Sequence, residues 1–229
     1  MTKSTTGLKA SRAAKPSLAP AIARVRIPNV ERSAATRAKL LNATIECLYE
    51  VGYHQTSTVL VAERAKVSRG SMLHHFPTKA DLMMATSEHI VELRSQLHQA
   101  HLDKLGSERE KFLNLIDALW GAFQTPSGIA RIEIMLGSRN DLELGPRFRV
   151  LHEALEDRHK ARIREQAKRL GIRDDRRINA SVQLYAATLR GLAIDTLWPR
   201  SMADIKGAVA LLKGFQEIML DRMLADANL

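Results

Sequence analysis

The segment of residues 68–79, SRGSMLHHFPTK, constrains the fold most strongly because the sequence marks both of its ends. Ser68 is a favourable N-cap, so a helix is expected to begin behind it. Met72 and Phe76 are four residues apart and therefore share one apolar face of that helix. Pro77 disfavours helical backbone at the residue before it. The sequence thus predicts a helix of about two turns with defined ends.

Helices are also expected on both sides of this segment. Apolar residues recur at helical spacing from Ser33 to Gly52, a residue type typical of helix C-termini. Ser57 can cap a second, short helix, and the T-x-x-D pair of Thr78 and Asp81 can begin a long one. Three helices in quick succession, the last two short and joined by a tight turn, form the helix-turn-helix pattern. In this motif, the second short helix enters the major groove of DNA. The alternative interpretation of the same pattern is an ordinary three-helix bundle.

The remainder of the chain is also expected to be helical. Of its 229 residues, 45% are apolar and only 4% aromatic, which together with the periodicity indicates an all-α protein. The long helices are expected at residues 79–104, 107–124, 127–138, 146–169, 175–197 and 203–226. We predict three parts, namely a disordered arm of residues 1–30, a helix-turn-helix DNA-binding domain of residues 31–78 and a helical ligand-binding and dimerisation domain of residues 79–229.

The last two expected helices carry the pattern of a subunit interface. The first of them sets small residues beside leucines, namely Leu184, Ala186, Ala187, Leu189, Gly191, Leu192 and Ala193. The second has apolar residues on more than one side, namely Ile205, Ala208, Val209, Leu211, Leu212, Phe215, Ile218 and Met219. Such a pair is typical of a four-helix interface in a homodimer, and burial within a single chain is the alternative.

The net charge of +10 is concentrated at the N-terminus. Residues 1–30 contain six basic residues, no acidic ones and three prolines that would interrupt a helix. Such an arm is expected to meet phosphate, although a solvated leader or a transit peptide would share this composition. No apolar run approaches the roughly 18 residues of a membrane span, so we expect a cytoplasmic protein without membrane contact. The single cysteine, Cys47, is expected in the core.

Several histidines raise the alternative of a metal or hydrolytic site. His74 and His75 would point about 100° apart around a helix, and no HExxH motif accompanies them. His152 and His159 are seven residues apart, which is more typical of a solvated helix face. The sequence contains neither a phosphate-binding glycine loop nor a nucleophile elbow. We therefore expect no metal, no cofactor and no enzymatic activity.

Residues 35–84 resemble the DNA-binding region of the tetracycline-repressor (TetR) family of transcriptional regulators. The most specific part is VSRGSMLHHFPTK, because V-S-x-G-x-L-Y-x-H-F-x-x-K is typical of the family. Two positions depart from that pattern. Lys66 stands where the family usually has glycine in a left-handed turn, a replacement that costs about 1 kcal/mol. Leu73 stands where the family usually has a tyrosine that reaches a phosphate, so this contact must come from elsewhere, for example from the basic arm.

The resemblance implies DNA contacts at the matching positions. The expected phosphate contacts are Ser57, Thr58, His75 and Lys79. The expected contacts to base edges are Ser68, Arg69, Gly70 and Ser71, with His74 extending this face to base or phosphate. The Arg69 guanidinium can donate hydrogen bonds to O6 and N7 of a guanine. Gly70 has no side chain and therefore lets the DNA approach the helix backbone closely.

The resemblance also implies a ligand pocket among the middle helices, where bulky apolar side chains are the usual lining. The candidates are Trp120, Phe123, Arg131, Met135, Phe148 and Tyr185. For each candidate other than Arg131, a plain core role is the more common one for such a side chain. Arg131 and Glu133 could orient a polar ligand or form a solvated pair. The resulting hypothesis is a dimeric repressor that an unknown small molecule releases from a palindromic double-stranded DNA operator. A DNA-binding dimer without an effector is the alternative.

Overall fold

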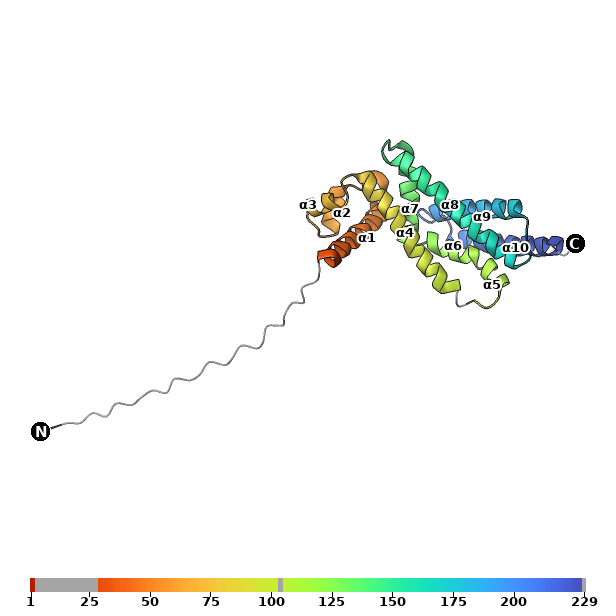
Figure 1. Ribbon diagram of the computed structural model, residues 1–229, viewed down its shortest axis with the longest axis horizontal. Coiled ribbons are helices and arrows are strands. Elements are labelled where there is room, and N and C mark those ends of the chain that lie inside the picture. The colour runs from red at the N-terminus through yellow and green to blue at the C-terminus, as the bar shows by residue number, and fades with distance from the viewer. Residues whose placement is uncertain (3–28, 103–104, 228–229) are drawn as a thin grey trace.

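The computed structural model describes residues 1–2, 29–102 and 105–227, and all regular secondary structure in these ranges is helical (Figure 1). The predicted basic arm of residues 1–30 lies almost entirely outside the described residues. The prediction of an all-α protein is confirmed. Within the described ranges, no helix combines the length and apolar character that crossing a membrane requires.

Three helices make up the N-terminal end of the molecule, namely α1 (Asn29–Gln55), α2 (Thr58–Arg64) and α3 (Arg69–His75) (Figure 1). The α1 helix begins four residues before Ser33 and is interrupted at Gly52, whose φ of 75° only glycine adopts readily. A final turn follows this interruption, so Gly52 marks a kink rather than the last residue of the helix. The break expected from the sequence is therefore present, and the chain continues beyond it.

The core of the three N-terminal helices extends into later parts of the chain. The α4 helix (Lys79–Leu102) and the α7 helix (Pro126–Gly137) both pack against α1. One apolar cluster joins these helices to the start of α8 and includes Leu40, Leu41, Leu48, Met72, Phe76, Leu82, Ala130, Ile134, Leu144 and Phe148. Cys47 is fully buried within it, as expected. The N-terminal helices therefore share their core with helices from residues 79–229.

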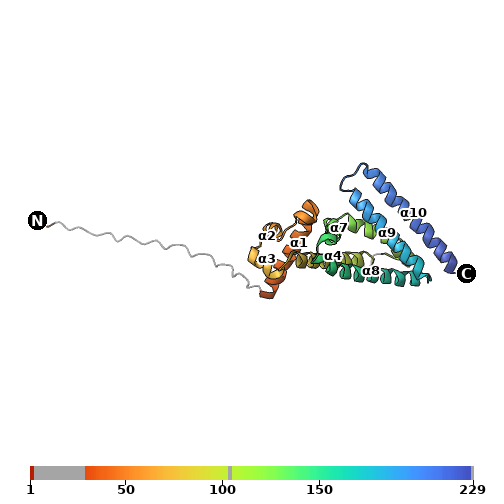
Figure 2. The ribbon, with the colours of Figure 1, turned by 90° about the horizontal axis from the view of Figure 1, so that it is seen from above.

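The remaining elements are α5 (Glu108–Leu113), α6 (Leu115–Phe123), a 3-10 turn (Ser138–Asn140), α8 (Leu144–Arg169), α9 (Asp175–Asp195) and α10 (Met202–Ala227). The helix expected at residues 107–124 is two helices that meet at Asn114. The α8 helix begins two residues before the expected start at residue 146, because Pro146 is tolerated in a first helical turn. Figure 2 shows α9 and α10 side by side at the end of the molecule opposite α3.

The α10 helix buries only one of its apolar sides. Its buried side chains include Ile205, Val209, Leu212, Leu220 and Met223, which recur at helical spacing. Leu211, Phe215 and Ile218 lie on the other side and are exposed. Burial among the described residues therefore accounts for part of the apolar pattern and leaves Leu211, Phe215 and Ile218 exposed.

Candidate functional site

The two short helices have the capping that the sequence predicts. The Ser57 hydroxyl accepts a hydrogen bond from the backbone N of Leu60 at 3.1 Å, and the Ser68 hydroxyl accepts one from that of Ser71 at 3.2 Å. Phe76 adopts an extended conformation before Pro77 and thereby ends α3. These local interactions fix the length and the start of α3, where the expected base contacts lie.

The turn between α2 and α3 adopts the left-handed conformation expected at Lys66, whose φ is 54°. The backbone N of Val67 donates to the carbonyl of Ala62 at 2.9 Å and closes this turn. Leu73, the other departure from the family pattern, is exposed on α3. Its side chain offers no hydrogen bond at the surface that carries the expected DNA contacts.

The expected DNA contacts gather on the outer surface of α2 and α3. Met72 and Phe76 are buried and hold the inner side of α3 against the core. The side chains that are exposed on the outer surface are Ser57, Ser68, Arg69 and His74, and the exposed Gly70 lies among them. Thr58, Ser71, His75 and Lys79 are only partly exposed. The arrangement gives α3 an apolar inner side and a polar outer side, as a groove-reading helix requires.

The two adjacent histidines occupy different environments. His74 is exposed, whereas His75 is partly buried beside Phe76, and burial lowers the pKa of His75, with smaller contributions from His74 and Arg37. Their ring centroids lie 5.6 Å apart at an interplanar angle of 66°. In the described part of the chain, no group of three His, Cys, Asp or Glu side chains is arranged to hold a metal ion.

Lys79 makes internal contacts that the sequence did not indicate. Its Nζ donates to the backbone carbonyl of Tyr53 at 2.7 Å and lies 4.2 Å from the centroid of the Tyr53 ring. Burial lowers the pKa of Lys79. The side chain therefore connects the start of α4 to the end of α1, and a phosphate contact by Lys79 would use its remaining N–H groups.

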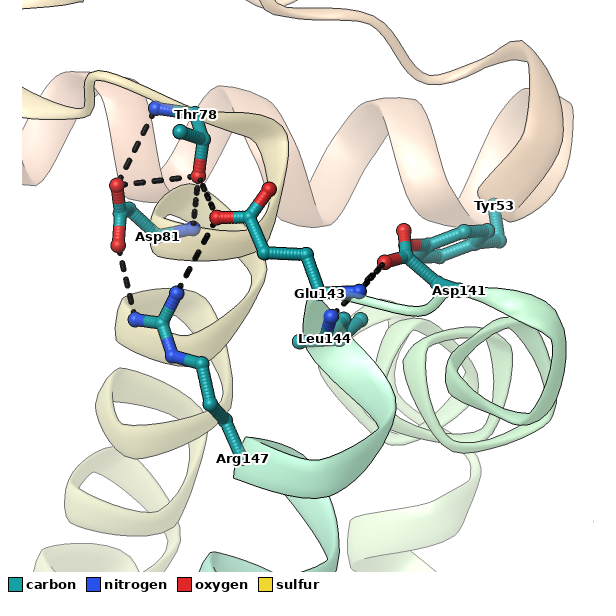
Figure 3. Close-up of polar contacts among 7 residues, drawn as sticks. All are labelled: Tyr53, Thr78, Asp81, Asp141, Glu143, Leu144 and Arg147. Carbon is teal, nitrogen blue, oxygen red and sulfur yellow. Dashed lines mark hydrogen bonds and ion pairs between the residues drawn. The ribbon is translucent and has the colours of Figure 1, made fainter.

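Tyr53 is the centre of a polar junction between the N-terminal helices and the rest of the molecule (Figure 3). Its hydroxyl donates to Asp141 Oδ2 at 2.7 Å, and its backbone N donates to Glu133 Oε2 at 2.9 Å. Glu133 therefore does not form the solvated pair with Arg131 that the sequence suggested. Gly137 lies against the Tyr53 ring so closely that a Cβ atom there would be 2.2 Å from Tyr53 Cγ.

A second group of contacts joins the start of α4 to the start of α8 (Figure 3). The Thr78 hydroxyl donates to Glu143 Oε1 at 2.7 Å, and Arg147 Nη2 donates to Asp81 Oδ1 at 2.8 Å. The Arg147 guanidinium is the main cause of a lowered pKa at Asp81. The T-x-x-D pattern was visible in the sequence, but its partners in α8 were not.

The six predicted pocket residues do not form one pocket. Phe123 belongs to an apolar cluster of α6, α7, α9 and α10, and Trp120 and Tyr185 pack against that cluster. Phe148 and Met135 belong to the separate cluster that includes α1, α3 and α4. The structure thus brings three of the aromatic candidates together and places the other two apolar candidates near the DNA-binding helices.

A cavity of about 40 Å³ lies among α5, α6, α8, α9 and α10, and Tyr185 is the one predicted pocket residue in its lining. Its other lining residues are Phe112, Leu115, Ile116, Leu119, His159, Ile163, Ile178, Ser181, Val182 and Gln216. The wall is mainly apolar with a few polar groups, which is the usual character of a small-molecule site. His159 and Gln216 were not anticipated, because helical periodicity does not reveal which distant helices meet.

The sequence and the fold are similar to those of known proteins. Residues 40–86 match the family model described as bacterial regulatory proteins, tetR family. The chain is also 27% identical over 175 residues to the HTH-type transcriptional regulator CymR of Pseudomonas putida, a match that covers 74% of this chain and 83% of CymR. The DNA-binding region of the chain is of the TetR type, and the chain is similar to TetR-type regulators over most of its length.

Further TetR-type proteins share parts of the sequence or the whole fold. The regulator BetI of Escherichia coli is 32% identical over 96 residues, and the matched region spans about half of BetI, 48%, and 40% of this chain. A solved TetR transcription regulator from Haloarcula marismortui has a TM-score of 0.62 at 17% identity, covering 81% of this chain and 98% of that protein. A Saccharomonospora viridis regulator, solved in complex with choline, has a TM-score of 0.62 at 18% identity, covering 80% and 96%.

These matches support a DNA-binding transcriptional regulator. The predictions of the family, of an N-terminal helix-turn-helix region followed by helices, and of a non-enzymatic role are confirmed by these matches. The individual DNA and ligand contacts and the domain boundaries remain predictions.

Proposed function

We propose that this TetR-family protein is a homodimeric repressor that binds a palindromic operator through α3 of each copy and is released by a small molecule. The observation that carries the DNA-binding part is the structure of α3. Its first turn presents Arg69 and Gly70 at the surface, while Met72 and Phe76 hold its inner side in the core. A cytoplasmic location follows from the proposed operator on chromosomal DNA.

The dimer is supported by the apolar surface of the last two helices. Leu184 on α9 and Leu211, Phe215 and Ile218 on α10 are all exposed. Gly214 lies among them with open space where a Cβ would be, so another helix could approach closely. Contiguous exposed apolar surface is typical of interaction sites, and a pair of helices from each of two copies would bury this one.

A small-molecule effector is supported by relatives of the same fold and by the cavity. The Saccharomonospora viridis regulator was solved with choline, and the multidrug binding protein EbrR, with a TM-score of 0.53, was solved with imidazole. In this chain, α4, α7 and α8 each have one end at the junction around Tyr53, and α8 also lines the cavity through His159 and Ile163. A ligand that favours one arrangement of these helices would change the spacing of the two α3 helices.

The base-reading role of Arg69 can be tested once the operator has been selected from genomic fragments that the purified protein retains. Arg69→Ala is expected to weaken operator binding by about 1–3 kcal/mol and to relax the preference for one base pair. Anisotropy titrations with operator and scrambled duplexes measure both effects. Arg139→Ala, an exposed residue of the 3-10 turn, removes the same charge as a control. Unchanged operator affinity in Arg69→Ala would show that Arg69 does not read bases.

The close approach of DNA at Gly70 gives a second test. A Cβ at Gly70 meets no atom within 4 Å in the protein, so Gly70→Ala is expected to preserve or slightly raise the free energy of unfolding. Operator affinity is nevertheless expected to fall by about tenfold, because the methyl group would meet the DNA instead. Chemical denaturation and operator titration of the same preparation separate the two effects. If Gly70→Ala bound the operator with wild-type affinity, the DNA would have to lie farther from this turn than we propose.

A further inference from the structure

The helical part of the chain contains a partly buried arginine, one of whose guanidinium nitrogens is buried without a partner among the described residues. Arg131 lies on α7, and its Nη1 is buried without a hydrogen-bond partner among the described residues. Its Nη2 lies 3.4 Å from Nδ1 of His152 on α8. A buried charge without compensation is unfavourable, so an unsatisfied guanidinium atom in a native structure calls for an explanation.

Two further arginines converge on Arg131 from other helices. Arg94 comes from α4 and Arg190 from α9, and both are close enough to reinforce the effect of burial, which lowers the pKa of Arg131 to about 10. The Arg94 guanidinium lies 5.6 Å from the centroid of the Phe123 ring, so it is held beside an apolar surface. Burial also lowers the pKa of Arg94, and Arg162 and Arg190 contribute to that effect. Arginines from α4, α7 and α9 thus bring three positive charges close to one another.

The carboxylates nearby do not neutralise this region. Among the side chains that the structure describes, none forms an ion pair with Arg94, Arg131 or Arg190. Glu156 on α8 is the one carboxylate that favours the charged form of Arg131, and it already contacts His152 Nε2 at 3.4 Å and Lys160 Nζ at 3.7 Å. The cluster of partly buried arginines therefore has more positive than negative charge, and a bound oxyanion would supply the missing partner.

An apolar cavity lies about two turns farther along α8 from this cationic cluster. Arg162 Nη2 lies 3.1 Å from Nδ1 of His159, and His159 lines the cavity together with Leu119, Ile163 and Tyr185. His152, Glu156, His159 and Ile163 follow one another at steps of four, three and four residues, so they share one face of α8. This face of α8 runs from the guanidinium groups to the cavity wall.

We propose that the effector is an amphipathic organic oxyanion, whose charged group is held by Arg94, Arg131 and Arg190 and whose apolar body extends along α8 towards the cavity and widens it on binding. This inference rests on the proposed ligand-responsive function and specifies the chemistry of its ligand. Guanidinium groups suit such an anion because their planar N–H forks match two of its oxygens. A cationic or neutral ligand would leave the buried positive charge uncompensated.

Four probes with the same alkyl chain test the charge requirement on the full chain, namely octanoate, octyl phosphate, octanol and octyltrimethylammonium. Calorimetry and thermal unfolding are expected to detect the two anions with Kd values below about 1 mM and to detect little or no binding of the others. Binding of octanoate alone would identify a carboxylate, and binding of octyl phosphate alone a phosphate ester. Failure of both anions to bind would overturn the inference, as would equal binding of octanol.

Arg131→Met tests the role of the buried guanidinium. The variant is expected to bind the preferred anion at least tenfold more weakly, while Arg131→Lys, which keeps the charge but not the fork, should have intermediate affinity. The Tm of the ligand-free Arg131→Met protein is expected to be unchanged or higher, because an unpaired buried charge is removed. A lower Tm with unchanged anion affinity would identify Arg131 as purely structural and overturn the inference. Arg176→Met, at an exposed position of α9, is the control.

Operator binding of the same wild-type preparation separates failure of this inference from failure of the proposed function. Selective operator retention with no response to either anion would refute the anionic effector and leave DNA regulation standing. Anion binding without any selective DNA retention would refute the proposed repressor and leave the anion site standing.

Discussion

Phe215→Glu is expected to convert the proposed dimer into a folded monomer. Phe215 is 55% exposed in the single chain, between Leu211 and Ile218 on the same exposed side of α10. A glutamate at this position stays hydrated in the monomer but would have to lose its hydration at the dimer interface. The carboxylates of the two copies would also repel each other there. Sedimentation or light scattering should report half of the wild-type mass, with an unchanged helical circular dichroism spectrum.

The same substitution is expected to weaken operator binding by about two orders of magnitude or more, because two linked recognition helices gain avidity of that size. Val150→Glu provides a matched control, since Val150 is 68% exposed on α8 and lies outside the proposed interface. Its mass and operator affinity should remain those of the wild type. If the Phe215→Glu protein remained dimeric, the dimer interface would have to lie on a surface other than this side of α10.

Gly137→Ala is expected to lower the free energy of unfolding by about 1–3 kcal/mol, the usual range for overpacking. The added Cβ would lie 2.2 Å from Cγ and 2.3 Å from Cδ1 of Tyr53, so the ring or α7 must move. Such a displacement would disturb the hydrogen bonds that Tyr53 makes with Asp141 and Lys79. We therefore also expect altered operator affinity and a weaker response to any ligand, measured by chemical denaturation and operator titration.

Gly121→Ala is the matched control for this experiment. Gly121 lies within α6, is exposed and has open space where a Cβ would be. Alanine is the better helix former, so this variant is expected to gain up to about 1 kcal/mol of stability. If both variants were equally stable, the close packing of Gly137 against Tyr53 would not describe the protein in solution.

Local signals in the sequence predicted most of the helix ends correctly. Ser57 and Ser68 cap their helices, Pro77 ends α3, and Lys66 adopts a left-handed conformation. In each case the physical cause lies within a few residues of the effect, so a short stretch of sequence contains the necessary information. The break at Asn114 was missed because neither glycine nor proline marks it.

Contacts between distant helices could not be predicted in the same way. Helical periodicity shows which side of a helix is buried, but it does not identify the partner helix. Glu133 was therefore considered beside Arg131, although it binds the backbone N of Tyr53, eighty positions earlier. Phe148 was similarly assigned to a ligand pocket, although it packs in the cluster that contains α1 and α3. Asp141 lies close in sequence to one of its partners, since its carboxylate accepts a hydrogen bond from the backbone N of Leu144, the first residue of α8.

The shared core of the N-terminal helices limits how hybrid regulators can be assembled from this protein. Ala130, Ile134, Leu144 and Phe148 pack in the same cluster as Leu48 and Met72. A chimaera joined after residue 78 would replace half of that cluster with residues selected for a different partner. Transplanting operator specificity into another regulator would therefore require the matching surfaces of α4, α7 and α8, or substitution of only the exposed residues of α3.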